Sequence, residues 1–246
     1  MRRLRRCKGD RALLEGPHLV GEAAAAGIEL ETVLATPELL ASAAGRELAG
    51  RLPRAPEEVA DDLLSAVLDA DSPRGVAAIA VLPRAGVETL PVRDGGTYLF
   101  VEGLQDPANL GALARSAEAA GACGMALGPG TVHPNHPRAL RASAGSLLRL
   151  PVAVDATAEA LDAHLAPARP RWAALAVRGG EPLWEASLDG TLVLALGAEG
   201  PGLSPELAAR ADLRLTVPTA GAVESLNATV AASLVLFEIR RRRTGG

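Results

Sequence analysis

Cysteines, aromatic residues and long apolar segments are all scarce in this 246-residue chain. Its two cysteines, Cys7 and Cys123, are too few for a disulfide framework or a zinc site, so we expect a reducing, cytoplasmic environment. Aromatic residues make up 2% of the chain, which disfavours a protein that stacks single-stranded bases on aromatic rings. No uncharged apolar stretch of about 20 residues is present, so no membrane-spanning helix and no membrane partner are predicted.

The residues that are present describe a globular protein. Hydrophobic residues make up 48% of the chain and charged residues 22%, which excludes a disordered tail and leaves enough chain for one or two domains. The net charge is −4, but basic residues cluster at positions 2–11 and 240–243. These clusters are compatible with phosphate binding and with solvated chain termini, and charge alone leaves both interpretations open.

Strand-like and helix-like segments alternate before residue 84, which indicates a small α/β unit. Helices are expected over 17–27, 37–48 and 59–70, and strands over 31–36 and 75–83. The next segment, RAGVETLPVRDGG, combines glycines, a proline and charges, as linkers do. We therefore interpret residues 1–83 as a first domain and residues 84–96 as a linker.

Residues 97–246 form a second α/β pattern. Expected strands are TYLFVEGL, MALG, PVAV, RWAALAV, TLVLALG and LRLTVP, separated by helical segments that include 109–121, 137–150 and 225–243. These strands are continuously apolar instead of alternating, which is typical of a parallel sheet covered by helices on both faces. Ligands of such sheets bind beyond the carboxyl ends of the strands.

The first candidate position follows the strand that ends at Val101. A polar loop leads into a helix with Asn109 near its start and Arg115 farther along. Asn109 suits a helix N-cap, and Arg115 must either extend to solvent or reach a fixed anion. The residues leave these alternatives open.

The second candidate position is LALGAEGPGL, where a strand runs directly into Gly197, Glu199, Gly200 and Gly202. Glycines there permit a close backbone approach to a ligand. The Lys-Ser/Thr end of a phosphate-binding P-loop and the GxGxxG dinucleotide pattern are both missing. Because Glu199 adds a negative charge, a neutral or cationic ligand fits this loop better than a phosphate.

The third candidate position follows a strand that ends at Pro218. Ser225 and Asn227 flank Leu226 at the start of the last helix, and either polar residue can cap that helix. A cap needs one such residue, so the pair indicates a further role.

Other chemistry-bearing residues carry weaker signals. His133 and His136 lie close together, but no cysteine or acidic cluster accompanies them, so no metal site is expected. No GxSxG nucleophile motif is present. We expect Trp172 and Trp184 to lie in the core.

Three segments carry a resemblance to a known family. In order, DPANLGALARSAEAAG, LALGAEGPGL and VPTAGAVESLNATVAASLVLFEI resemble the motifs of the SpoU (TrmH-like) RNA 2′-O-ribose methyltransferases of the SPOUT superfamily. The resemblance covers about residues 100–246 and includes RASAGSLLRLPV. Residues 11–80, with EGPHLVGEA and DSPRGVAAI, look like the family's substrate-binding domain, a ribosomal-protein-like α/β module.

The resemblance implies a parallel sheet with a C-terminal trefoil knot and a homodimer whose active site uses both subunits. It implies S-adenosylmethionine as cofactor, contacted by Leu196, Gly197, Val217, Pro218 and Leu226. It also implies catalytic positions at Asn109, Arg115, Glu199, Ser225 and Asn227, with Arg115 engaging the RNA phosphate and activating the ribose hydroxyl. Metal is not part of the implied chemistry.

The implied function is methyl transfer to a ribose 2′-hydroxyl of RNA. The two-domain arrangement favours ribosomal RNA over tRNA as the substrate. A tRNA methyltransferase and a non-catalytic RNA-binding ribosome-assembly factor with the same fold are the alternatives. The glycine loop at 197–202 counts against the non-catalytic alternative, because such a factor has no need of a cofactor pocket.

Overall fold

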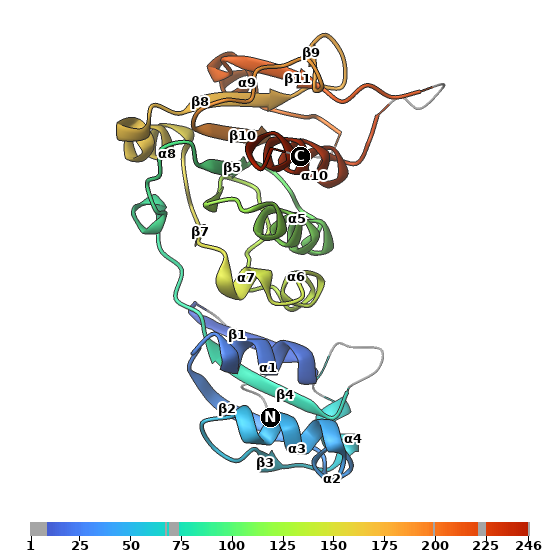
Figure 1. Cartoon of the computed structure of the whole chain (residues 1–246). Coiled ribbons are helices and arrows are strands. Elements are labelled where there is room, and N and C mark those ends of the chain that lie inside the picture. Colours follow the sequence, from blue (N-terminus) through green and yellow to red (C-terminus); the bar gives the residue numbers. More distant parts are fainter. Residues whose placement is uncertain (1–8, 67, 69–73, 199, 221–224, 246) are drawn as a thin grey trace.

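The structure is a computed structural model that describes residues 9–66, 68, 74–198, 200–220 and 225–245. These residues contain two sheets, which lie in different parts of the molecule (Figure 1). Strands of the first sheet fall between residues 11 and 81, and strands of the second fall between residues 97 and 216. We refer to residues 9–83 as the N-terminal part and to residues 97–245 as the C-terminal part.

The sheet of the N-terminal part is mixed. Its order is β1-β4-β2-β3, in which β4 is antiparallel to β1 and β2, and β3 is parallel to β2. Its elements are β1 (Arg11–Glu15), α1 (Pro17–Ala25), β2 (Leu30–Ala35), α2 (Pro37–Ala41), α3 (Ala43–Arg51), β3 (Glu57–Glu58), α4 (Asp61–Ser65) and β4 (Val76–Val81). The predicted α/β unit is confirmed. Strand β1 was not predicted, because five residues with a charge at each end carry little periodicity.

The sheet of the C-terminal part is parallel in every strand pair, in the order β7-β6-β5-β10-β8-β11-β9. Its strands are β5 (Thr97–Val101), β6 (Gly124–Leu127), β7 (Val152–Ala153), β8 (Arg171–Leu175), β9 (Glu181–Pro182), β10 (Leu192–Leu196) and β11 (Leu213–Thr216). Its helices are α5 (Pro107–Ala120), α6 (Pro137–Ala142), α7 (Ser146–Arg149), α8 (Ala158–Leu165), α9 (Pro205–Arg210) and α10 (Ala228–Arg243), with a 3-10 turn at Ala166–Ala168. Another 3-10 turn, Val87–Thr89, lies in the segment between the two parts. The predicted parallel sheet is confirmed.

Helices cover both faces of this sheet, as the apolar strands predicted. In β5, Leu99 and Val101 belong to the apolar cluster that includes residues of α5 and α10. Tyr98 and Phe100 belong to a second cluster with residues of α8 and α9. Successive strand residues point to opposite faces, so a strand buried on both sides consists mostly of apolar residues.

Two predicted helices are each broken into two. The segment 37–48 divides at Ser42, whose extended backbone ends α2 and whose hydroxyl accepts a hydrogen bond from the Gly45 amide to begin α3. The segment 137–150 divides at Ala144 and Gly145, which both have positive φ. Their apolar periodicity continues across each break, so the pattern alone did not indicate a turn.

The C-terminal arginine cluster has a structural role that the charge pattern did not specify. The guanidinium of Arg242 donates to the carbonyl oxygens of Leu183, Trp184 and Ala186 at 2.6–3.0 Å. Arg243 donates to Thr97 Oγ1 at 2.8 Å and to the Gly190 carbonyl at 2.9 Å. These two arginines fasten the end of α10 to loops that flank β9 and β10. The N-terminal cluster, apart from Arg11, lies outside the described residues.

The two tryptophans differ. Trp172 is buried, with its ring 5.6 Å from that of Phe100 and its indole N–H donating to Asp162 Oδ1. Trp184 is 53% exposed, so its predicted place in the core is wrong. It follows β9, which lies at one edge of the sheet.

Gly111 allows α5 and α6 to pack closely. A Cβ atom at this position would lie 2.4 Å from the Ala139 carbonyl oxygen and 2.6 Å from the Ala142 Cβ. Any side chain at Gly111 would therefore push α6 away from α5.

We expect Gly111→Ala to lower the free energy of unfolding by about 1–3 kcal/mol, because the added methyl group overpacks this contact. The matched control is Gly50→Ala in α3, where an added Cβ meets no atom within 4 Å. That control should gain about 0.5–1 kcal/mol from helix propensity. Urea unfolding followed by circular dichroism measures both variants. Equal effects at the two positions would contradict this interpretation.

Candidate functional site

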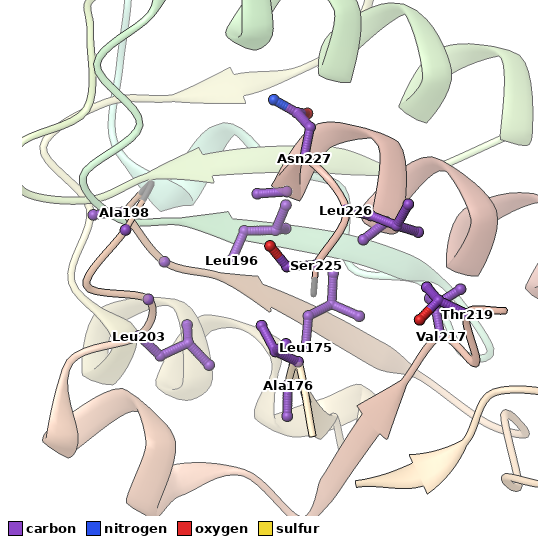
Figure 2. Close-up of a pocket in the computed structure, with 16 residues that line it drawn as sticks. Leu175, Ala176, Leu196, Ala198, Leu203, Val217, Thr219, Ser225, Leu226 and Asn227 are labelled. Carbon is purple, nitrogen blue, oxygen red and sulfur yellow. The ribbon is translucent and has the colours of Figure 1, made fainter. Parts of the chain in front are cut away.

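A cavity of about 430 Å³ lies at the carboxyl ends of β8, β10 and β11, beside the start of α10 (Figure 2). Its volume is within the range of about 300–1,000 Å³ that is usual for small-molecule sites. Leu175, Leu196, Val217 and Leu226 contribute apolar surface, and Ser225 and Asn227 contribute polar atoms. This is the edge of the sheet at which the sequence predicted a ligand site.

One wall of the cavity is backbone, where the chain folds back on itself after β10. A Cβ atom on Gly197 would lie 2.1 Å from the carbonyl carbon of Gly202, so no other residue fits there without moving the loop. The Gly202 amide donates to the Ala198 carbonyl at 2.9 Å, and Gly200 and Gly202 both have positive φ. Peptide groups of Gly197, Gly200 and Gly202 therefore form part of this surface, beside Ala198 and Leu203.

Residues that follow β5 also contact this loop and the segment after it. A carboxylate oxygen of Glu102 accepts a hydrogen bond from the Ser204 amide at 3.3 Å, and the Ser204 hydroxyl caps α9. A Cβ atom on Gly103 would lie 2.8 Å from that of Ala198. The loop that begins at Gly197 is thus held between β5 and α9.

Asn227 is the N-cap of α10. Its side-chain oxygen accepts hydrogen bonds from the amides of Thr229 at 2.9 Å and Val230 at 3.2 Å. Helix capping, which the sequence predicts as one role of Asn227, therefore occupies its side-chain oxygen. Its Nδ2 group is the part that remains for a ligand. Ser225 lies outside the helix, which begins at Ala228 and not at residue 225 as predicted.

The first turn of α5 is capped by Asp106, not by Asn109. The Asp106 carboxylate accepts a hydrogen bond from the Ala108 amide at 2.8 Å, so the N-cap interpretation of Asn109 is wrong. The Asn109 carbonyl instead accepts a hydrogen bond from the Thr229 hydroxyl at 3.3 Å. This bond joins the beginning of α5 to the beginning of α10.

The predicted cofactor residues are close together. Leu196, Gly197, Val217 and Leu226 line the cavity. Pro218 lies between two lining residues without lining the cavity itself, and it comes after the end of β11 at Thr216.

The predicted catalytic residues divide into two groups. Ser225 and Asn227 line the cavity, whereas Asn109 and Arg115 are not among its lining residues, and Arg115 is exposed on α5. Glu199 lies outside the described residues. Of the four predicted catalytic residues that the structure describes, two therefore lie in the cavity and two outside it.

Sequence reasoning missed the part of the cavity that follows β8. Leu175, Ala176 and Val177 line it, although the segment RWAALAV was singled out only as a strand. The rule that ligands bind at carboxyl ends of parallel strands applies equally to β8 and was the available signal. Among the described residues, no group of three or more His, Cys, Asp or Glu side chains is arranged to hold a metal ion. No described helix is long and apolar enough to cross a membrane.

We expect Asn227→Ala to lower the free energy of unfolding by about 1 kcal/mol, because two amides of α10 lose their acceptor. Asn227→Asp keeps an acceptor oxygen and should stay within about 0.5 kcal/mol of the unaltered chain. Urea unfolding of the two variants measures the difference. Equal stability of Asn227→Ala and the unaltered chain would show that the cap contributes nothing.

Comparisons with known proteins agree with this geometry. The model of the "SpoU rRNA Methylase family" matches residues 96–237, and that of the "MRM3-like substrate binding domain" matches residues 1–78. The chain is 30% identical over 241 residues to the 23S rRNA (guanosine(2553)-2′-O)-methyltransferase RlmP of Bacillus subtilis, covering 96% of this chain and 90% of that one.

A second relative is the 23S rRNA (uridine(2479)-2′-O)-methyltransferase of Streptomyces viridochromogenes, which is 28% identical, with 99% and 87% coverage. Among solved structures, the SpoU methyltransferase AviRb from Streptomyces viridochromogenes, in complex with the cofactor AdoMet, superposes with a TM-score of 0.85 at 26% identity, covering 96% of this chain and 92% of that one. The fold is therefore the SPOUT methyltransferase fold with an N-terminal substrate-binding domain, while the trefoil knot stays a prediction. Because its family model matches more than half of the residues, this chain belongs to the SpoU rRNA methylase family.

Proposed function

We propose that this protein transfers a methyl group from S-adenosylmethionine to a ribose 2′-hydroxyl of ribosomal RNA. The observation that carries the proposal is the backbone-walled cavity at the start of α10, where the family's cofactor positions fall together. The two relatives described above modify a guanosine and a uridine at the same sugar oxygen. Because these relatives modify the same oxygen on nucleotides with different bases, they support the ribose as the reacting group. The identity of the modified nucleotide stays open.

The cavity suits S-adenosylmethionine. Leu196, Val217 and Leu226 offer apolar surface for the flat adenine, and peptide groups around Gly197 offer hydrogen bonds without a competing cation. When bound, this cofactor supplies an electrophilic methyl group on a positively charged sulfur. A wall of peptide groups favours such a ligand over a phosphate, for which the P-loop pattern is missing.

The remaining task is to make a weakly acidic hydroxyl react. A ribose 2′-hydroxyl must lose its proton as it attacks, and a guanidinium cannot act as the base because it stays protonated. We assign Arg115 the role of stabilising the developing negative charge and holding the neighbouring phosphate, whose oxygen takes the proton.

Asn109, Ser225 and Asn227 position the sugar, with the Asn227 Nδ2 group as donor because its oxygen caps α10. Glu199 completes the family's set.

We infer that the active unit is a homodimer. Arg115 is not among the residues that line the cavity of its own chain, which supports a site completed by Arg115 of the partner subunit. Val230, Leu234 and Phe237 form an apolar stripe on α10, with exposures of 49%, 40% and 47%. Their spacing of four and three residues places them on one helix face. Ser116 and Ser233 hydrogen-bond at 2.8 Å, which sets this stripe beside the helix that carries Arg115.

The cavity and the N-terminal part also bear on the alternative functions. A non-catalytic RNA-binding factor would not need the close approach of Gly197 to Gly202, so the cavity disfavours it. The N-terminal part, which matches a substrate-binding domain, favours ribosomal RNA over tRNA. A cytoplasmic location follows from that substrate and from the scarcity of cysteine.

We expect Arg115→Ala to bind S-adenosylmethionine normally and to lose at least about 100-fold in kcat, as when one charge-stabilising donor is removed. Calorimetry and methyl transfer to ribosomal RNA measure the two properties. Mixing Arg115→Ala with Asn227→Ala chains should restore activity, because one site of the mixed dimer contains both residues. Retained turnover in Arg115→Ala would refute the role of the guanidinium, and failure of the mixture would refute sharing between subunits.

We expect Phe237→Asp to convert the dimer into monomers, because a charge in the apolar stripe must be desolvated on association. Sedimentation velocity measures the change. Leu63→Asp is the matched control, since Leu63 is also about half exposed but lies on α4 of the N-terminal part. Dimers of unchanged stability in Phe237→Asp would place the subunit contact elsewhere.

A further inference from the structure

The segment between the two sheets is packed against the C-terminal part along its length. Ala85 pairs with Ala153 of β7, and the Leu90 carbonyl lies 2.8 Å from the ring nitrogen Nε2 of His164 on α8. The buried Tyr98 hydroxyl donates to the Pro91 carbonyl at 2.6 Å and accepts from the Arg93 amide at 2.9 Å. These contacts are not those of a flexible tether.

Arg84 fixes the beginning of this segment. Its Nε donates to Asn135 Oδ1 at 2.8 Å and its Nη2 to the Leu147 carbonyl at 3.2 Å. The Asn135 amide donates in turn to the Leu82 carbonyl at 3.1 Å. Burial lowers the pKa of Arg84 to about 10, so the guanidinium is still charged at neutral pH. Residues 82–84 are therefore bonded directly to the loop before α6 and to α7.

Ion pairs join the two parts away from the connecting segment. Arg141 of α6 pairs with Glu15 at the end of β1, and the Glu15 side chain is 3% exposed. Arg149 of α7 pairs with Glu22 of α1 and, at 2.7 Å, with Glu118 of α5. A buried carboxylate that loses its ion-pair partner strongly destabilises the folded protein. Separation of the two parts is therefore opposed by these ion pairs as well as by apolar contacts.

Apolar packing completes the connection. Leu14 of β1 and Leu140 of α6 belong to one continuous buried cluster that also reaches β5 and β10. Figure 1 shows β1 and α1 directly below α6 and α7, which are the elements that the ion pairs and the apolar cluster join. The N-terminal and C-terminal parts therefore share a core.

We propose that Arg84, Arg141 and Arg149 are positioning residues that hold the N-terminal part at one orientation to the cavity, so that it selects which ribose is methylated. The inference rests on the proposed function. When the N-terminal part binds the RNA, only the nucleotide at a fixed distance from this binding surface reaches the cavity. Misplacement of a reacting group by about 1 Å can cost about 100-fold in rate, so a fixed orientation discriminates between neighbouring nucleotides.

The experiment compares a triple variant, Glu15→Gln with Arg141→Gln and Arg84→Gln, with the unaltered chain. Removing Glu15 and Arg141 together leaves no unpaired buried charge, which favours folding of the variant. The matched control is Arg210→Gln, which loses an ion pair with Glu159 inside the C-terminal part. If the triple variant does not fold, Glu22→Gln with Arg149→Gln replaces it.

The first measurement is the distance between spin labels at Arg54→Cys and Ala163→Cys, two exposed positions, with Cys7 and Cys123 replaced by serine. Pulsed electron paramagnetic resonance on protein diluted with unlabelled chain reports one subunit. We expect a narrow distribution in the unaltered chain and in Arg210→Gln, and a broad one in the triple variant. A broad distribution in the unaltered chain would overturn the proposal.

The second measurement maps 2′-O-methylation at each nucleotide of ribosomal RNA treated with each protein. We expect the triple variant to methylate neighbouring riboses and to lose at least about tenfold in kcat/KM at the native position. Its affinity for S-adenosylmethionine should stay within about twofold, because the cavity is untouched. A broadened distance distribution with unchanged site selection would overturn the proposal. If the unaltered chain transfers no methyl group to RNA, the proposed function fails, and the selection role fails with it.

Discussion

Parallel strands in one sheet all end at the same edge, and this constraint determines where the protein can bind a ligand. β10 lies between β5 and β8, so the loops that follow these three strands meet, although their strands are far apart in sequence. The central residues of each strand are mostly apolar and are buried on both faces. The polar and glycine residues that line the cavity therefore come from the loops.

Glycine acts at two kinds of position around that cavity. Gly197 brings two stretches of backbone within van der Waals distance and so forms a wall of peptide groups. Gly111, in the helix that follows β5, has no ligand to contact; it lets α6 approach α5. Because α6 also carries Arg141, that close packing links the cavity region to the interface with the N-terminal part. The two glycines, which lie in different motifs, are thus required for different physical reasons.

Much of this arrangement can be predicted from the sequence, for physical reasons that apply residue by residue. Strands β5 and β10 are buried on both faces, and their uninterrupted apolar residues indicate this directly. The breaks at Ser42 and Gly145 were not predictable from periodicity, since a single residue with an altered backbone dihedral interrupts no apolar pattern. The exposure of Trp184 depends on its edge strand, and strand order is a property of the whole fold.

In the candidate site, too, some features can be predicted from the sequence and others cannot. The lining residues in loops that directly follow a strand are predictable from the sequence, because the end of every parallel strand lies at the carboxyl edge of the sheet. The separation of Arg115 from that cavity was not predictable from the residues themselves, because it depends on where α5 lies relative to α10. The C-terminal arginines are similar: charge alone is compatible with phosphate binding and with solvation, yet Arg242 and Arg243 bind carbonyl oxygens of loops more than fifty residues earlier.

Helix α10 is the last element of the chain, and it contributes at both of its ends. Its beginning supplies Asn227 and Ala231 to the cavity, and its end is fastened through Arg243 to the start of β5 and to Gly190. During synthesis, the cavity therefore stays incomplete until α10 has left the ribosome. Truncation before residue 227 removes this side of the cavity altogether.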